Sequence, residues 1–282
     1  MVLELLMNPR RAERTPWEMF FVGLVYATVA LFLALWVFED HAGLVMVFLT
    51  VLACTYLIQG TFGREEKKDE SSPKNFLLRE HSRVLMYLVF LFLGFVVAFS
   101  LLYILLPASV VESVFDIQIK TIGAINSGFS SDTLFLSKIF FNNMKVLFFC
   151  ILFAFFYGAG AVFILAWNAS VVGAAIGTVA RNKLAELAQD AGFSLLSQYL
   201  SVFSFGFMRY MTHGIFEIAA YFIAALGAGI ISIAVMRHNF GSRGFMRVLN
   251  DSSNLILLSV VLLFVAALVE VYVTPFIVSV FF

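Results

Sequence analysis

Apolar segments long enough to cross a membrane recur along this chain of 282 residues, and they limit its fold more than any other feature. A membrane-spanning helix needs roughly 20 predominantly apolar residues. Six clear runs are residues 17–38, 42–62, 84–106, 139–167, 211–236 and 254–275. Only 13% of the residues are charged, against about 25% in soluble domains. Because a helix satisfies its own backbone hydrogen bonds in lipid, the sequence predicts an all-α polytopic membrane protein.

The net charge and the cysteines limit the kinds of partner and bond that this chain can have. The formal net charge is zero, so the chain lacks the basic character of a nucleic-acid-binding protein, and the expected partner is the lipid bilayer. Cys54 and Cys150 lie inside apolar runs and read as small core residues rather than a disulfide. Residues 1–16 lack the apolar core of a signal peptide. We therefore expect residues 1–282 to form a single integral membrane domain.

The distribution of Lys and Arg predicts the orientation in the cell membrane. Basic residues gather in residues 1–16, 63–83 and 237–250, and basic loops remain on the cytoplasmic side. Residues 63–83 are the most charged of these and are expected to be a solvated cytoplasmic loop, with a partner-docking surface as the alternative. The connections at 39–41 and 108–138 should face outside. This arrangement puts the N-terminus in the cytoplasm and the C-terminus outside.

The same assignment predicts the number of crossings. Lys138 lies outside and Arg237 inside, so an odd number of spans must separate them. Two clear runs lie between them, which requires a third crossing within 168–210, and residues 193–210 are the most apolar part of that region. Residues 168–180 are rich in Gly and Ala and are expected to form a broken or re-entrant segment. The prediction is seven spans, or five to six if one of these segments does not cross.

One helix, expected over 211–236, carries an ionisable pair at its start. His213 and Glu217 are four residues apart and therefore lie about 40° apart on one face, at about 100° per residue. Small residues continue along that face, and such residues let a second helix approach closely in lipid. They are Ala220, Ala224, Gly227 and Ala228. The sequence predicts a helix-packing stripe headed by a polar pair.

Polar residues of three predicted spans reach one level in the outer half of the bilayer. The set is Asn142, Asn143, Lys145, His213, Glu217 and Glu270. Ionisable groups in a membrane are costly and usually pair with one another. We expect Glu217 and Glu270 to approach each other, with Lys145 and His213 neutralising them. The cluster would either lock helices together or bind an ion or solute; the alternative is coincidence, since polar residues gather near helix ends.

These motifs resemble the stage II sporulation protein M family. The resemblance rests on Asn142-Asn143 opening a span, Asn168 at the end of that span, His213-Gly214-x-x-Glu217, and Glu270 followed by Thr274-Pro275. It covers roughly residues 85 to 280 and adds Asn168 to the polar cluster. One departure is Ala169, where the family typically has Gly, because Ala disfavours the sharp turn that Gly permits. The sporulation members look like membrane scaffolds that assemble peptidoglycan-remodelling enzymes.

Metal chemistry is a further alternative at this cluster. His213 and Glu217 at i, i+4 spacing resemble half of a metal site, and Glu270 would complete a set of one His and two carboxylates suited to zinc or a non-haem metal. A catalytic metal also needs a position open to water. The chain has no nucleotide-binding loop, serine triad or HExxH motif. We expect no cofactor and favour a protein that is not an enzyme.

Two classes of function follow from the sequence. The first is a non-enzymatic scaffold or permease-like subunit that associates with other membrane proteins or with copies of itself. The second is a transporter or channel that binds a proton, ion or small solute at the polar cluster, which the interrupted region at 168–180 favours because broken helices line transport sites. No internal repeat supports the second class. The family resemblance favours the first.

Overall fold

The computed structural model describes residues 8–71, 77–126, 132–157, 161–187, 195–237 and 242–276. All elements in these ranges are helical, including a 3-10 turn (η1) and a π-helical turn (η2). They are α2 (Pro9–Arg14), α3 (Glu18–Val37), η1 (Glu39–His41), α4 (Ala42–Ser71), α5 (Leu77–Leu105), α6 (Ala108–Asn126), α7 (Asp132–Tyr157), α8 (Ala161–Leu187), α9 (Leu195–Arg237), α10 (Arg243–Leu268) and η2 (Val269–Val273). The predicted all-α fold is confirmed.

Seven helical segments are long and apolar enough to cross a membrane. They are Glu18–Val37, Ala42–Lys67, His81–Leu105, Phe135–Phe155, Val162–Asn182, Thr212–Arg237 and Arg243–Phe276. This confirms the prediction of a polytopic membrane protein with about seven spans.

The prediction of a broken or re-entrant segment within 168–210 is wrong for the part of that region that the structure describes. Helix α8 runs without interruption through 168–180 and contains a full candidate span. Residues 195–210 are the first part of α9, a single helix of 43 residues. The extra crossing therefore lies at 162–182 rather than 193–210. Residues 188–194 lie outside the described residues.

Glycines in α8 serve close packing instead of a break. A Cβ at Gly173 would lie 2.7 Å from the Cβ of Phe99, and one at Gly177 would lie 2.5 Å from the ring of Tyr103. Small residues at a helix interface allow such an approach in lipid, where packing rather than the hydrophobic effect holds helices together. The Gly- and Ala-rich composition of 168–180 thus reflects the contact of α8 with α5.

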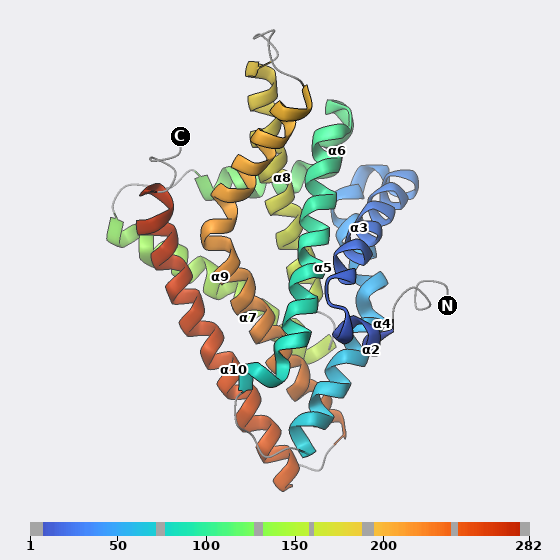
Figure 1. Cartoon of the computed structure of the whole chain (residues 1–282), viewed down its shortest axis with the longest axis vertical. Coiled ribbons are helices and arrows are strands. Elements are labelled where there is room, and N and C mark those ends of the chain that lie inside the picture. The colour runs from blue at the N-terminus through green and yellow to red at the C-terminus, as the bar shows by residue number, and fades with distance from the viewer. Residues whose placement is uncertain are drawn as a thin grey trace.

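Contacts between helix termini define two ends of the bundle. At one end, which we call the basic end, Arg237 at the end of α9 pairs with Glu66 of α4, and Glu65 of α4 pairs with His81 of α5. At the opposite end, Ser113 of α6 donates to the carbonyl oxygen of Glu39 at 3.4 Å. The basic end is the lower end in Figure 1, where α4, α9 and α10 converge.

At the opposite end, Arg181 of α8 holds the end of α5. Its guanidinium donates to the carbonyl oxygens of Ile104 and Leu106 and lies over the ring of Tyr103. Pro107 follows directly and cannot donate to a helical hydrogen bond, so these carbonyl oxygens are near a helix end that needs donors from elsewhere. The arginine supplies them.

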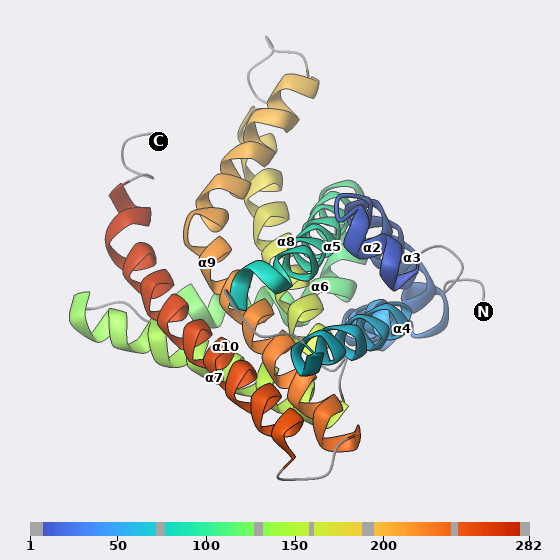
Figure 2. The same cartoon turned by 60° about the horizontal axis from the view of Figure 1, so that its bottom comes forward.

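Helix α9 forms the centre of the bundle. Residues 220–230 are all buried, and α9 contacts α4, α5, α7, α8 and α10. Helix α7 crosses α9 and α10 obliquely, as both views of the fold show (Figures 1 and 2). Each neighbour of α9 can therefore place a side chain against a different stretch of it.

The two longest predicted connections are largely helical. Helix α4 continues to Ser71 and α5 begins at Leu77, so residues 63–71 and 77–83 of the expected loop are helical. Residues 72–76 lie outside the described residues. The expected connection at 108–138 contains α6 and the first turns of α7; residues 127–131 lie outside the described residues. Both predictions underestimated the helices because the charged residues were assigned to loops.

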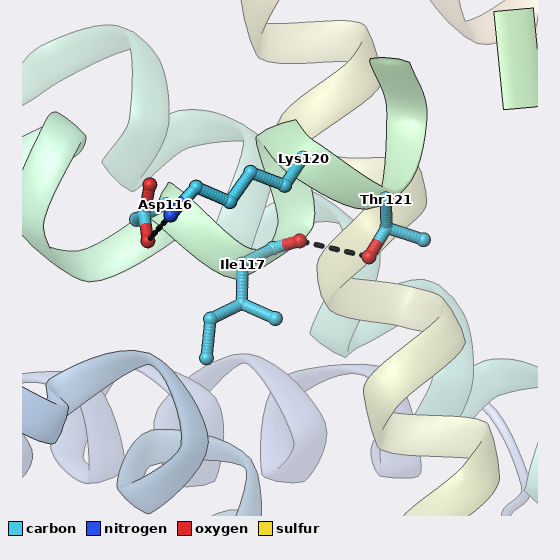
Figure 3. A network of polar contacts seen from close by, with 4 residues as sticks. All are labelled: Asp116, Ile117, Lys120 and Thr121. Carbon is cyan, nitrogen blue, oxygen red and sulfur yellow. Dashed lines mark hydrogen bonds and ion pairs between the residues drawn. The ribbon is translucent and has the colours of Figure 1, made fainter. Parts of the chain in front are cut away.

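Helix α6 is not among the candidate spans. Its exposed side carries an ion pair between Lys120 and Asp116 at 2.7 Å, and the Thr121 hydroxyl donates to the carbonyl oxygen of Ile117 at 2.8 Å (Figure 3). Its buried Gln118 amide donates to Ser170 of α8 at 3.2 Å. Helix α6 is thus amphipathic: one side is exposed, and the other side packs against the membrane-spanning helices.

Candidate functional site

Glu217 of α9 and Glu270 of η2 are neighbours at the interface between α9 and the end of α10. The side-chain amide of Asn143 in α7 donates to Oε1 of Glu217. Both glutamates are partly buried and Asn143 is buried. We call these three residues the carboxyl contact; it joins α7, α9 and the end of α10.

A second contact lies one turn from the carboxyl contact along α9. His213 Nδ1 is 3.3 Å from Oγ1 of Thr274, and the Thr274 hydroxyl donates to the carbonyl oxygen of Val269 at 3.2 Å. A hydroxyl has one proton to donate. Because Val269 receives it, Thr274 accepts from His213, which requires the proton of the neutral imidazole to be on Nδ1.

Glu270 belongs to the π-helical turn Val269–Val273. Such turns are rare within α-helices and occur frequently at functional sites. The Thr274 hydroxyl bonds to a carbonyl five residues earlier, so it closes this wider turn. The turn, the His213–Thr274 contact and the carboxyl contact therefore form one continuous polar region between α9 and α10.

Apolar packing surrounds this region on the side toward the basic end. Tyr221, one turn further along α9, is buried. The buried Cys150 thiol of α7 donates to its carbonyl oxygen at 3.6 Å. Phe222 packs edge-to-face on Phe92 of α5, with ring centroids 5.9 Å apart. The carboxyl contact thus lies at the edge of a tightly packed core.

The structure does not bring the other residues of the predicted cluster to this contact. The side chains of Asn142 and Lys145 are exposed, and Lys145 is in none of the ion pairs among the described residues. Asn168 donates to the carbonyl oxygen of Ile164 in its own helix at 2.7 Å. The neutralising role expected of Lys145 therefore stays a prediction.

The small-residue stripe of α9 is buried along its length. Ala220, Ala224 and Ala228 are at most 1% exposed. A Cβ at Gly227 would lie 2.9 Å from the backbone carbonyl oxygen of Ser252 and 3.3 Å from Cβ of Leu255 in α10. At Gly227 the two helices approach closely, as small residues permit.

No group of three or more His, Cys, Asp and Glu side chains within the described ranges is arranged to hold a metal ion. His213 contacts Thr274 through Nδ1. The observed arrangement is hydrogen bonding between neutral and acidic side chains across helix interfaces.

Three ion pairs at the basic end were not anticipated from the sequence. The His81 Nδ1 to Glu65 Oε2 distance is 2.5 Å, Arg237 pairs with Glu66 at 3.2 Å, and Arg64 pairs with Glu13 at 3.5 Å. Two sequence features could have pointed to them: the acidic pair that follows the second apolar run, and the arginine that follows the 211–236 run. These signals mark the residues as interfacial but do not say which helices meet.

The fold and the site are those of a multi-pass helical membrane protein whose spans are joined by polar contacts. A family model described as Stage II sporulation protein M matches residues 83–275. The chain belongs to that family, and the match contains both glutamates of the carboxyl contact. Neither the curated proteins nor the solved structures contain a match to this chain.

Proposed function

We propose that this protein is a non-enzymatic scaffold or permease-like subunit of the stage II sporulation protein M family in the cell membrane. In this role it associates with other membrane proteins or with further copies of itself. The observation that supports the proposal is that buried polar side chains form hydrogen bonds between helices. Asn143 bonds to Glu217, Gln118 to Ser170, and Thr178 to Tyr103, and each of these bonds joins one helix to another.

Such bonds favour a fixed arrangement of helices. A polar side chain in lipid that bonds across a helix interface contributes about 1 kcal/mol. Together with close glycine contacts, these bonds fix the relative positions of the helices. A fixed helix arrangement suits a subunit that presents a constant surface to partners.

The association is tested by chemical cross-linking in native membranes at native expression level. The expected result is a cross-linked species that contains this chain with a second copy or with another membrane protein in fixed proportion, retained in mild detergent. A chain that stays monomeric at every cross-linker concentration contradicts the proposal. The same sample without cross-linker is the control.

The proposed orientation has the N-terminus in the cytoplasm and the C-terminus outside. Exposed positions at the two ends of the bundle test it: Glu39→Cys and Phe276→Cys should react with an impermeant thiol reagent in intact cells. Lys67→Cys should react only after permeabilisation. The native Cys54 and Cys150 are buried and give little background. Labelling of Lys67→Cys but not Glu39→Cys in intact cells would reverse the orientation.

A transporter or channel is the second candidate, and the carboxyl contact on a π-helical turn is the observation that favours it. Paired carboxyl groups within spans mark proton and ion pathways. Reconstituted vesicles with an internal pH-sensitive dye distinguish the two candidates. A proton response that is lost in Glu217→Gln and kept in Lys145→Met supports transport. No response from a correctly folded sample supports the scaffold.

A further inference from the structure

One side of α7 carries polar side chains that are directed away from the bundle. The opposite side packs on α9 and is buried; it comprises Asn143, Leu147, Cys150 and Ala154. We call the exposed side the outer face of α7, and its residues are Phe141, Asn142, Lys145, Phe148 and Phe149. Because Asn142 and Lys145 are three residues apart, they are neighbours on the helix surface.

These two polar residues lie within a candidate membrane span. Lys145 is ten residues from each end of the span Phe135–Phe155, which is about 15 Å along the helix at 1.5 Å per residue. The adjacent Asn143 donates to Glu217 of α9, which lies inside the span Thr212–Arg237. The outer face of α7 therefore lies at membrane depth.

Lipid is an unfavourable neighbour for an amide and an ammonium group. Such groups in a span usually face the bundle interior or a water-filled cavity, because hydrocarbon forms no hydrogen bonds with them. Yet α7 is the least buried of the seven candidate spans: 22% of its apolar window is buried, against 83% for that of α9. It lies at the edge of the bundle and extends past α10 in both views (Figures 1 and 2). A neighbour from outside this chain is therefore needed to cover its outer face.

A second copy of this chain is a poor match for the outer face of α7. Two copies in one membrane have the same orientation, so the axis of a symmetric dimer runs along the membrane normal and equivalent residues meet at the same depth. Lys145 would then face the Lys145 of the second copy, and like charges repel strongly away from water. A different protein avoids this repulsion.

A lipid headgroup is a poor match as well. A lysine near the end of a span can extend its long side chain to the headgroups, but Lys145 is in the middle of its span. The shorter Asn142 side chain reaches only groups at its own depth. A helix that crosses the membrane beside α7 can offer a carboxylate to Lys145 and a hydrogen-bond acceptor to Asn142 at one level.

We propose that the outer face of α7 is a docking surface for a transmembrane helix of a different membrane protein, and that this helix carries an Asp or Glu that pairs with Lys145. The exposed rings of Phe141, Phe148 and Phe149 lie before and after Lys145 along α7 and pack against the apolar remainder of the partner helix. This docking surface rests on the proposed role as a subunit that associates with other membrane proteins. It specifies the span that makes the contact and the charge that the partner carries.

Energy transfer to designed helices tests this surface. The purified protein, with a donor dye at Phe276→Cys, is reconstituted in neutral phosphatidylcholine vesicles. The probes are acceptor-labelled helices of Leu and Ala that carry one Asp at the centre, one Asp midway to either end, or no Asp. We expect an Asp helix to bind the otherwise unchanged protein and Lys145→Arg, and to bind Lys145→Met about tenfold more weakly. Lys120→Met, which changes an exposed lysine of α6, is the matched control and should bind the helix unchanged.

Two further measurements accompany the binding assay. Asn142→Leu should weaken binding by a smaller factor than Lys145→Met, because it removes a neutral donor instead of a charge. Thermal unfolding of each variant shows that it is folded; both positions are exposed, so the unfolding temperatures should stay close to that of the wild type.

Several outcomes would overturn the docking surface. One is binding of the Asp helices that Lys145→Met retains in full, and another is equal binding of the helix without Asp. Energy transfer between donor- and acceptor-labelled copies of this chain that Lys145→Met abolishes would assign the face to a second copy. Displacement of the Asp helix by added phosphatidylglycerol would assign Lys145 to a lipid headgroup.

Cross-linking in native membranes separates this proposal from the proposed function. If the wild type and Lys145→Met form the same cross-linked species with another membrane protein, the association stands and a different face makes it. A wild type that stays monomeric contradicts the proposed function and the docking surface together. The expected result is a species that the wild type and Lys145→Arg form and Lys145→Met loses.

Discussion

The carboxyl contact and the basic end accommodate glutamates inside the bundle in different ways. Both place glutamates in a largely apolar bundle. At the basic end, Glu65 and Glu66 are at most 1% exposed and each faces a basic side chain, His81 or Arg237. At the carboxyl contact, Glu217 faces Glu270 and the neutral amide of Asn143.

The difference shows two means of tolerating a buried acid. Opposite charges can remain ionised together when their attraction offsets the loss of hydration. Two neighbouring acids lack this attraction, and at the carboxyl contact the observed support is the amide of Asn143, which donates to Glu217. The first arrangement should lose stability when the basic partner is removed, and the second when the amide donor is removed.

The largest effect is expected for His81→Leu. This change leaves the fully buried Glu65 without its imidazole partner, and breaking a buried pair costs about 3–5 kcal/mol. Thermal unfolding in detergent measures the loss. The double variant Glu65→Leu/His81→Leu removes both groups and should recover most of the stability. Equal stability of the wild type and His81→Leu would mean that the pair contributes nothing.

Asn143→Leu should have an effect of about 1–2 kcal/mol. The change removes the amide that donates to Glu217, and hydrogen bonds to charged groups contribute about 1.5–3 kcal/mol. The loss is reduced because Glu217 is partly exposed. Asn142→Leu, at an exposed position one residue away, is the matched control and should change the unfolding temperature little. A larger loss of stability for Asn142→Leu than for Asn143→Leu would contradict the assignment of Asn143 as the donor to Glu217.

The smallest effect is expected for Lys145→Met. Lys145 is exposed and makes no ion pair among the described residues, and surface substitutions away from special features usually remain within ±0.5 kcal/mol. Thermal unfolding again provides the measurement. A strong destabilisation would instead show that this lysine neutralises the carboxyl contact.

The number and type of spans could be predicted because membrane thickness fixes the length of an apolar helix. The location of the extra crossing could not, since residues 168–180 have a composition that suits either a broken helix or a tightly packed one. Only the neighbours of Gly173 and Gly177 in the folded protein, Phe99 and Tyr103 of α5, show that these glycines serve close packing. Helix-packing partners far apart in the sequence leave no local signal.

The expected level of Glu217 and Glu270 followed from the charge-derived topology, which gives the depth of a residue but not its direction. The spacing within α7 already separates two members of the predicted cluster. Asn143 and Lys145 are two residues apart and thus about 200° apart around a helix, so they cannot both face Glu217. The ion pairs at the basic end were beyond such reasoning because they join α4 to α5 and to α9.

The π-helical turn at Val269–Val273 has a consequence for insertions and deletions in α10. A π turn accommodates one more residue than the corresponding α-helical turn, so deletion of Val273 would allow regular α-helix to continue. Each residue of an α-helix turns it by about 100°. Because the π turn absorbs the extra residue, this deletion leaves the helix after it near its present orientation, whereas deletion of a residue from the regular part of α10 rotates everything after it by that angle. The π turn is therefore a place where the helix can lose one residue without changing the face that its C-terminal end presents.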